Sequence, residues 1–91
     1  MVFAKQLRDG IRRGEITRTV RIWQRCHVKV GGRYRVVDGH VVVTSILPIT
    51  LADITGSLAR QCGFKGVVDL LKVARHGPGR NVFLIDFRYE A

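Results

Sequence analysis

The most informative segment of this chain reads Gly14-Glu15-Ile16-Thr17-Arg18-Thr19-Val20-Arg21-Ile22-Trp23. Its side chains alternate in character, which predicts a β-strand over residues 16–22, because successive side chains of a strand face opposite sides. The even-numbered side chains from Ile16 to Ile22 face one way, and the odd-numbered ones from Thr17 to Trp23 face the other. The odd face combines hydroxyls, a guanidinium and an indole, so we expect it to line a polar cleft.

Positive charge is concentrated in the same part of the chain. The net charge is +9, and residues 1–35 hold ten of the sixteen basic side chains but only two of the seven acidic ones. Arginine outnumbers lysine twelve to four, and arginine binds phosphate through paired hydrogen bonds and stacks on bases. This distribution favours a nucleic-acid partner. The alternative is a basic protein whose charge serves only solubility.

Length and composition predict one globular domain over residues 1–91. A content of 46% hydrophobic and 25% charged residues is ordinary for a folded protein and too apolar for a disordered one. Apolar runs such as Val41-Val42-Val43 are far shorter than the ~20 residues of a membrane span, and the first residues contain no apolar signal segment. We therefore expect a cytoplasmic protein with no membrane association, in which Cys26 and Cys62 are free thiols.

An amphipathic helix is predicted over residues 2–13, ahead of the first strand. Phe3, Leu7 and Ile11 recur every four residues, which places them on one buried stripe. Gly14 follows where the end of a helix belongs, because glycine readily adopts the left-handed conformation of a C-terminal cap.

Further strands are predicted at residues 33–38, 40–46 and 81–89. Asp38-Gly39 is a hairpin turn signal between the first two of these. Pro48 either ends the second or confines it to a sheet edge.

Two helices are predicted before the last strand. Thr55 or Ser57 caps the first, and Gly63 follows its end. The second spans residues 67–74, and His76-Gly77-Pro78-Gly79 then breaks the chain. Four or five short strands with these helices predict an α+β domain built on a small, partly open barrel.

The start of the first strand carries a string that is typical of a known domain family, G-x-K-x-x-T-x-R. Gly14, Thr19 and Arg21 match this string, and Ile16 stands at the lysine position.

Two further segments are similar to the same family. Residues 51–55 are followed by Gly63-Phe64 and a leucine-rich helix, and residues 81–87 are similar to the family's aromatic last strand. With the three segments in this order, the chain resembles the ASCH domain, a branch of the PUA-like superfamily, over essentially its whole length. The resemblance implies a small PUA-like β-barrel of about five strands flanked by two to three helices, with a cleft beside the first strand.

The resemblance also implies a function. The family is generally regarded as RNA-binding, and some small members look like ribonucleases or amidohydrolases of acylated cytidine nucleosides. In the amidohydrolase-type members a lysine, a threonine and a glutamate line the cleft. The threonine corresponds to Thr19, the lysine position is Ile16, and the glutamate falls at or near Cys62, so two of the three groups are absent here.

The candidate catalytic residue is Thr19, whose hydroxyl is a poor nucleophile without an activating base. Ile16 supplies none, and arginines stay charged and make poor bases. Cys62 would need a nearby histidine to become a nucleophile, and a packing thiol is the simpler interpretation. The cysteines and histidines lack zinc-ligand spacing, so we expect no metal and no cofactor.

The leading hypothesis is an RNA- or nucleotide-binding domain with a basic cleft beside the first strand. Thr19 and Arg21 are expected at its floor, and Trp23 either stacks on bases or packs in the core. The expected nucleic-acid-binding residues are Arg18, Thr19, Arg21, Trp23, Arg25, Arg33 and Arg35. The alternatives are a small hydrolase of the ASCH family and a protein-interaction module, and we expect a monomer or a weak dimer.

Overall fold

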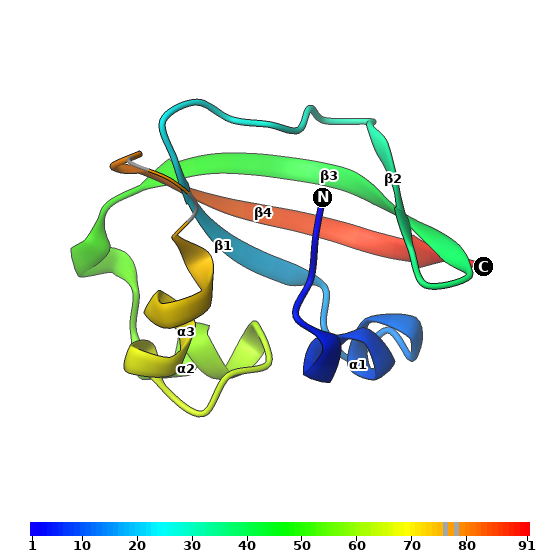
Figure 1. The fold of residues 1–91 in the computed structure, drawn as a ribbon, viewed down its shortest axis with the longest axis horizontal. Helices are drawn as coiled ribbons and strands as arrows, with labels where there is room; N and C mark the ends of the chain where they lie inside the picture. The colour runs from blue at the N-terminus through cyan, green and yellow to red at the C-terminus, as the bar shows by residue number, and fades with distance from the viewer. Residues whose placement is uncertain (76, 78) are drawn as a thin grey trace.

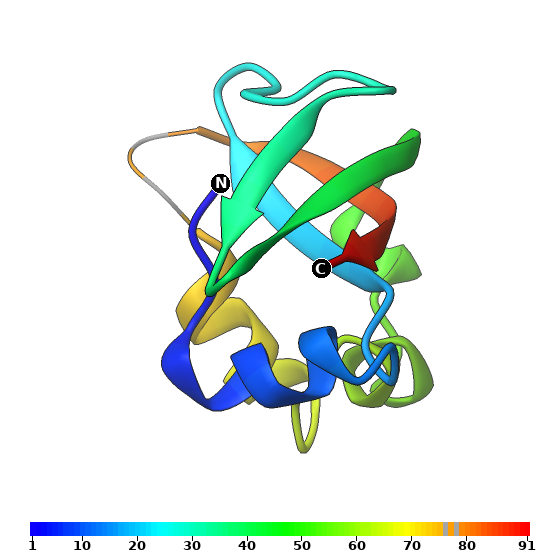
Figure 2. The ribbon, with the colours of Figure 1, turned by 90° about the vertical axis from the view of Figure 1, so that its right-hand side faces the viewer.

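Four strands of one antiparallel sheet form the centre of the molecule. The computed structural model describes residues 1–75, 77 and 79–91. Within them the strand order is β1-β4-β3-β2, and the strands are β1 (Arg18–Trp23), β2 (Arg33–Val36), β3 (Gly39–Ile49) and β4 (Asn81–Glu90). The sheet curls into a half-barrel (Figure 1 and Figure 2). The expected α+β class is confirmed, whereas a fifth strand is not seen in the described ranges and the PUA-like topology stays a prediction.

The helices α1, α2 and α3 lie on one side of this sheet (Figure 1). The helical segments are η1 (Lys5–Leu7), α1 (Arg8–Arg12), η2 (Leu51–Asp53), α2 (Gly56–Gln61) and α3 (Val67–Ala74). Thr55 caps α2 by accepting a hydrogen bond from the Leu58 backbone N–H at 3.1 Å, so of the two proposed caps it is the one used. The expected break at residues 76–79 includes His76 and Pro78, which lie outside the described residues.

The first helix is shorter than the predicted one over residues 2–13. The chain is extended at Ala4 (φ −58°, ψ 142°), and helical structure begins only at Lys5. Phe3 leaves the helix because its ring packs against Phe87, with the ring centroids 5.4 Å apart. The predicted buried stripe is nevertheless correct, since Phe3, Leu7 and Ile11 are all buried.

The strand β1 is buried on both faces. Val20 and Ile22 pack with Ala59 of α2 and Leu70 of α3, and Trp23 on the other face packs inside the half-barrel. Burying one such aliphatic side chain contributes about 1.5–3 kcal/mol. This strand therefore joins the helical layer to the interior of the sheet.

The strand β3 bends just after its pairing with β2 ends, while its pairing with β4 continues. Val43 pairs with Phe87 and Ser45 with Asp86, which leaves Thr44 outside the register as a β-bulge. Bulges bend a strand and increase its twist, and this one helps the sheet to curl. The strand continues through Pro48 beyond the end of β2, which is the edge position that proline tolerates.

The turn between β2 and β3 lies one residue earlier than predicted. Val36 pairs with Gly39, so the loop residues are Val37 and Asp38 rather than Asp38 and Gly39. Gly39 is the first residue of β3, and it has no room for a side chain, because a Cβ there would collide with the Glu90 carbonyl oxygen and the Tyr89 hydroxyl. In the turn, Val37 has a φ of +57°, which is unfavourable for a β-branched residue.

Val37→Gly is expected to stabilise the protein. The left-handed conformation destabilises an L-residue by about 1–2 kcal/mol. Glycine removes this strain, but it loses more conformational entropy on folding, which costs about 0.5–1 kcal/mol. We expect a net gain of up to about 1 kcal/mol in the free energy of unfolding, measured by urea titration. The control is Val30→Gly, at an exposed valine outside the positive-φ set. A Val37→Gly protein no more stable than this control would contradict strain at Val37.

Candidate functional site

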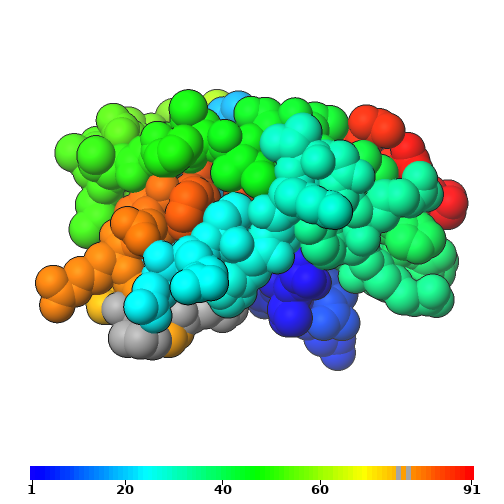
Figure 3. Space-filling view, turned by 90° about the horizontal axis from the view of Figure 1, so that it is seen from above, coloured from blue at the N-terminus to red at the C-terminus, as the bar shows by residue number. Residues whose placement is uncertain are grey.

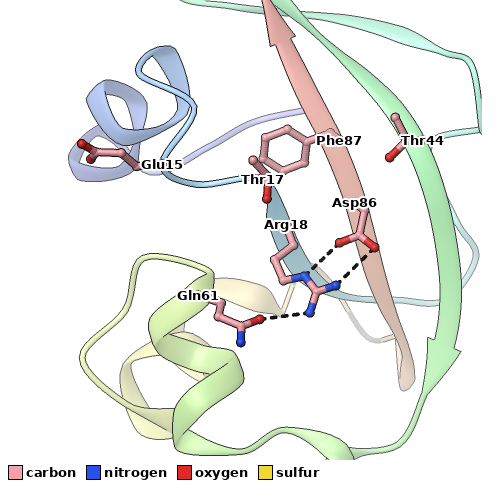
Figure 4. Close-up of a pocket in the computed structure, with 7 residues that line it drawn as sticks. All are labelled: Glu15, Thr17, Arg18, Thr44, Gln61, Asp86 and Phe87. Atoms are coloured by element: carbon pink, nitrogen blue, oxygen red, sulfur yellow. Dashed lines mark hydrogen bonds and ion pairs between the residues drawn. The ribbon is translucent and has the colours of Figure 1, made fainter.

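The two faces of β1 open onto different hollows. The first has a volume of about 580 Å³ and is lined by Glu15, Thr17, Arg18, Thr44, Gln61, Asp86 and Phe87. Thr44 reaches it from the β3 bulge and Gln61 from the end of α2, as Figure 4 shows. We call it the polar hollow.

Arg18 is already engaged inside the polar hollow. Its Nε donates to Asp86 Oδ1 at 2.9 Å, and its Nη1 donates to Gln61 Oε1 at 3.0 Å (Figure 4). Arg18 and Asp86 are direct partners across β1 and β4. Glu15 also lines this hollow and pairs with Arg13 at 3.2 Å. With two carboxylates and one arginine in its lining, the polar hollow does not suit a polyanion.

Ile16, at the family's lysine position, does not line the polar hollow. A Cβ at Gly10 or at Gly63 would collide with Ile16 Cδ1, so the side chain fills the space between α1 and the end of α2. It packs with the cluster that includes Leu7 and Phe64. The position expected to hold an amine therefore provides an apolar contact.

Thr19 and Arg21 lie inside the half-barrel, and each is 5% exposed. Arg21 Nε donates to Thr19 Oγ1 at 3.3 Å, and the guanidinium carbon lies 4.9 Å from the centre of the Phe3 ring. Burial lowers the pKa of Arg21 to about 10, so it remains a cation at neutral pH. Both side chains are buried, because the sheet curls over this face and Phe3 lies against Arg21, and their expected place at the floor of a binding cleft stays a prediction. A catalytic role for Thr19 stays a prediction.

Trp23 is a core residue rather than an exposed platform. It is 4% exposed, and its ring stacks on the exposed His27 imidazole with centroids 4.6 Å apart and planes 11° apart. Of the two roles considered for Trp23, core packing is the one found. Its face nevertheless borders a second hollow.

Two further hollows share the N-terminal residues Met1 and Val2 in their lining. One, of about 250 Å³, is lined by Met1, Val2, Arg21, Trp23, His27 and Val28. The other, of about 330 Å³, is lined by Met1, Val2, Phe3, Arg8, Arg35, Val36 and Val37. We call them together the N-terminal groove. Figure 3 shows the N-terminal residues, in dark blue, between the cyan β1–β2 loop and the β2–β3 hairpin. Among the described residues, no carboxylate side chain lines either hollow.

The remaining predicted binding residues divide between this groove and its surroundings. Arg35 lines the groove, Arg25 is exposed on the β1–β2 loop, and Arg33 pairs with Glu90 at 3.0 Å. Arg8 and His27 were not among the predicted binding residues. Their sequence signal was only basic character, because no local pattern shows that Arg8 lines the same hollow as Arg35.

Cys62 is a packing thiol, as the simpler interpretation held. It is 1% exposed, and burial raises the pKa of its thiol to about 11. Cys26 and Cys62 are both free, as expected. Within residues 1–75, 77 and 79–91, no group of three or more His, Cys, Asp or Glu side chains is arranged to hold a metal ion. None of the described helices has the length and apolarity that a bilayer crossing requires.

Searches against protein-family models, curated proteins and solved structures gave no match. The resemblance to the ASCH domain therefore stays a prediction, and the function is argued from the site.

Thiol labelling at pH 8 is expected to distinguish the two cysteines. With a pKa of about 11, roughly one Cys62 thiol in a thousand is ionised at that pH, and only the thiolate reacts. An aromatic disulfide reagent should label one thiol rapidly in the folded protein and two in urea, and Cys26→Ser should remove the rapid phase. Labelling of Cys62 should rise as the pH approaches 11. If two thiols of the folded, unmodified protein react rapidly, Cys62 is not a buried packing thiol.

Proposed function

We propose that this chain binds single-stranded RNA, or a nucleotide-like ligand, in the N-terminal groove. The observation that carries the proposal is the charge of the lining, which contains three arginines and a histidine without a carboxylate among the described residues. A polyanion gains from such a surface because its binding releases counterions. The polar hollow on the other face of β1 lacks this charge excess.

Ion pairing elsewhere supports the choice of this surface. Asp38 and Asp9, the carboxylates nearest to the groove along the chain, both contact Arg12, at 3.8 and 4.0 Å. Within the described part of the chain, neither Arg8 nor Arg35 has an ion pair within 4.0 Å. Asp38 is close enough to Arg35 for an electrostatic interaction, but neither guanidinium is held in an ion pair by a described residue. Both can therefore contact phosphate groups, which arginine binds in a bidentate manner.

The neighbouring loop extends the positive surface. Arg25 and Lys29 are exposed between β1 and β2, close in sequence to His27. A strand of RNA that follows the groove can therefore contact the loop as well. The groove consists of small hollows rather than one broad concave face, which suits a single strand whose bases are separated.

We also propose that the domain is of the ASCH type and cytoplasmic. The helices on one side of a curled sheet support a PUA-like fold (Figure 1), and the matching Gly14, Thr19 and Arg21 precede or lie within β1. The two free thiols support a reducing compartment.

Removing the two exposed groove arginines is expected to weaken RNA binding. In the double variant Arg8→Ala/Arg35→Ala, the affinity for a labelled single-stranded RNA should fall roughly tenfold at 100 mM salt, and the slope of log affinity against log salt should decrease by about 1–2. Fluorescence anisotropy over a salt series measures both quantities.

The matched control is Arg60→Ala/Lys72→Ala, which removes the same charge from α2 and α3. It should retain the affinity of the unmodified protein to within about twofold if the groove is the binding surface. Equal losses in the two double variants would show that only net charge matters. An unmodified protein that binds neither RNA nor a mononucleotide at 100 mM salt would refute the proposed function.

A further inference from the structure

An exposed side chain, that of His27, stacks on one face of Trp23. The His27 imidazole lies parallel to the indole, with centroids 4.6 Å apart and planes 11° apart. His27 itself is exposed, whereas Trp23 is 4% exposed. Because exposed side chains change rotamer within nanoseconds, the imidazole can leave this position without disturbing the core. A flat aromatic face then opens into the groove.

The hollow beside this stack combines a buried cation with apolar walls. Arg21 lines it, together with Val2 and Val28, and Arg21 is 5% exposed. A charge in such surroundings acts on an anion more strongly than it would in water, because the local dielectric is low. The hollow therefore offers a stacking surface and a positive charge at once.

The size of the hollow limits what it can hold. Its volume of about 250 Å³ is below the range of roughly 300–1,000 Å³ that is typical of sites for drug-sized ligands. It suits one planar ring system rather than several. The adjoining hollow, which is lined by Arg8 and Arg35, can then accommodate the next groups of a longer ligand.

We propose that the hollow lined by Arg21, Trp23 and His27 is a subsite for one nucleotide, whose base displaces the His27 imidazole from the face of Trp23. The larger ring of a base covers more of the indole than an imidazole does, and base–aromatic stacking tolerates any base. The phosphate of the same nucleotide lies toward the arginines of the groove. This inference rests on the proposed function and names the unit of the ligand that the site recognises.

The fluorescence of Trp23 reports on this subsite directly, because it is the only tryptophan in the chain. We expect adenosine monophosphate to quench its emission in a saturable manner, adenosine to do so with lower affinity, and inorganic phosphate to leave it unchanged. A short oligoadenylate should produce the same quenching at lower concentration, which separates an RNA strand from a free nucleotide as the preferred source.

Two substitutions of His27 test the displacement. His27→Ala removes the competing ring, so adenosine monophosphate should bind roughly three- to tenfold more tightly. His27→Phe replaces the imidazole with an apolar ring that remains stacked, so the affinity should fall by a similar factor. Val30→Ala is the control, because Val30 lies on the same loop, is exposed and does not line the groove; its affinity should be unchanged.

The subsite is refuted if adenosine monophosphate leaves the emission unchanged in both the unmodified protein and His27→Ala, if the two bind it equally, or if inorganic phosphate alone gives the same quenching. If RNA binding depends on Arg8 and Arg35 but the Trp23 emission does not change, the proposed function is retained and the subsite is refuted. Nucleotide binding that depends on His27 without any RNA binding would retain the subsite and refute RNA as the ligand of the groove.

Discussion

The burial of β1 on both faces governs the arrangement of the molecule. Helices cover one face of the strand, and the other face lies inside the half-barrel. A guanidinium on such a strand needs local partners, because an isolated buried charge is costly. Arg21 contacts the Thr19 hydroxyl and the Phe3 ring. The N-terminal segment is thus bound to the strand that it covers, and the groove forms along this segment.

Ion pairing then decides where the positive charge remains effective. Arg18 is held by Asp86 in the polar hollow, and Arg12 is close to both Asp9 and Asp38. These pairs are local and largely cancel their own fields. The N-terminal groove has no comparable carboxylate among the described residues of its lining. The electrostatic character of each surface therefore depends on which carboxylates the fold brings near it, and the net charge of +9 alone does not reveal this.

Most of the helices and strands could be predicted from nearby residues, and the exceptions have a common cause. The helix over residues 67–74 and the Thr55 cap depend on local periodicity and local hydrogen bonds, and both are correct. The turn after β2 was misplaced because the space available at Gly39 depends on Tyr89 and Glu90. The first helix was predicted too long for a similar reason, since Phe3 packs on distant residues.

Local sequence was sufficient for the α+β class, for the strand that follows Gly14 and for the excess of basic residues in the first third of the chain, because each depends on neighbours along the backbone. The exposure of Thr19, Arg21 and Trp23 could not be predicted in this way. A strand that alternates polar and apolar side chains looks the same whether its polar face meets water or the inside of a curled sheet. Contacts between distant segments, such as Phe3 with Arg21 and Asp86 with Arg18, determine which of these side chains are buried. As a result, the N-terminal groove is the most positive hollow among the described residues.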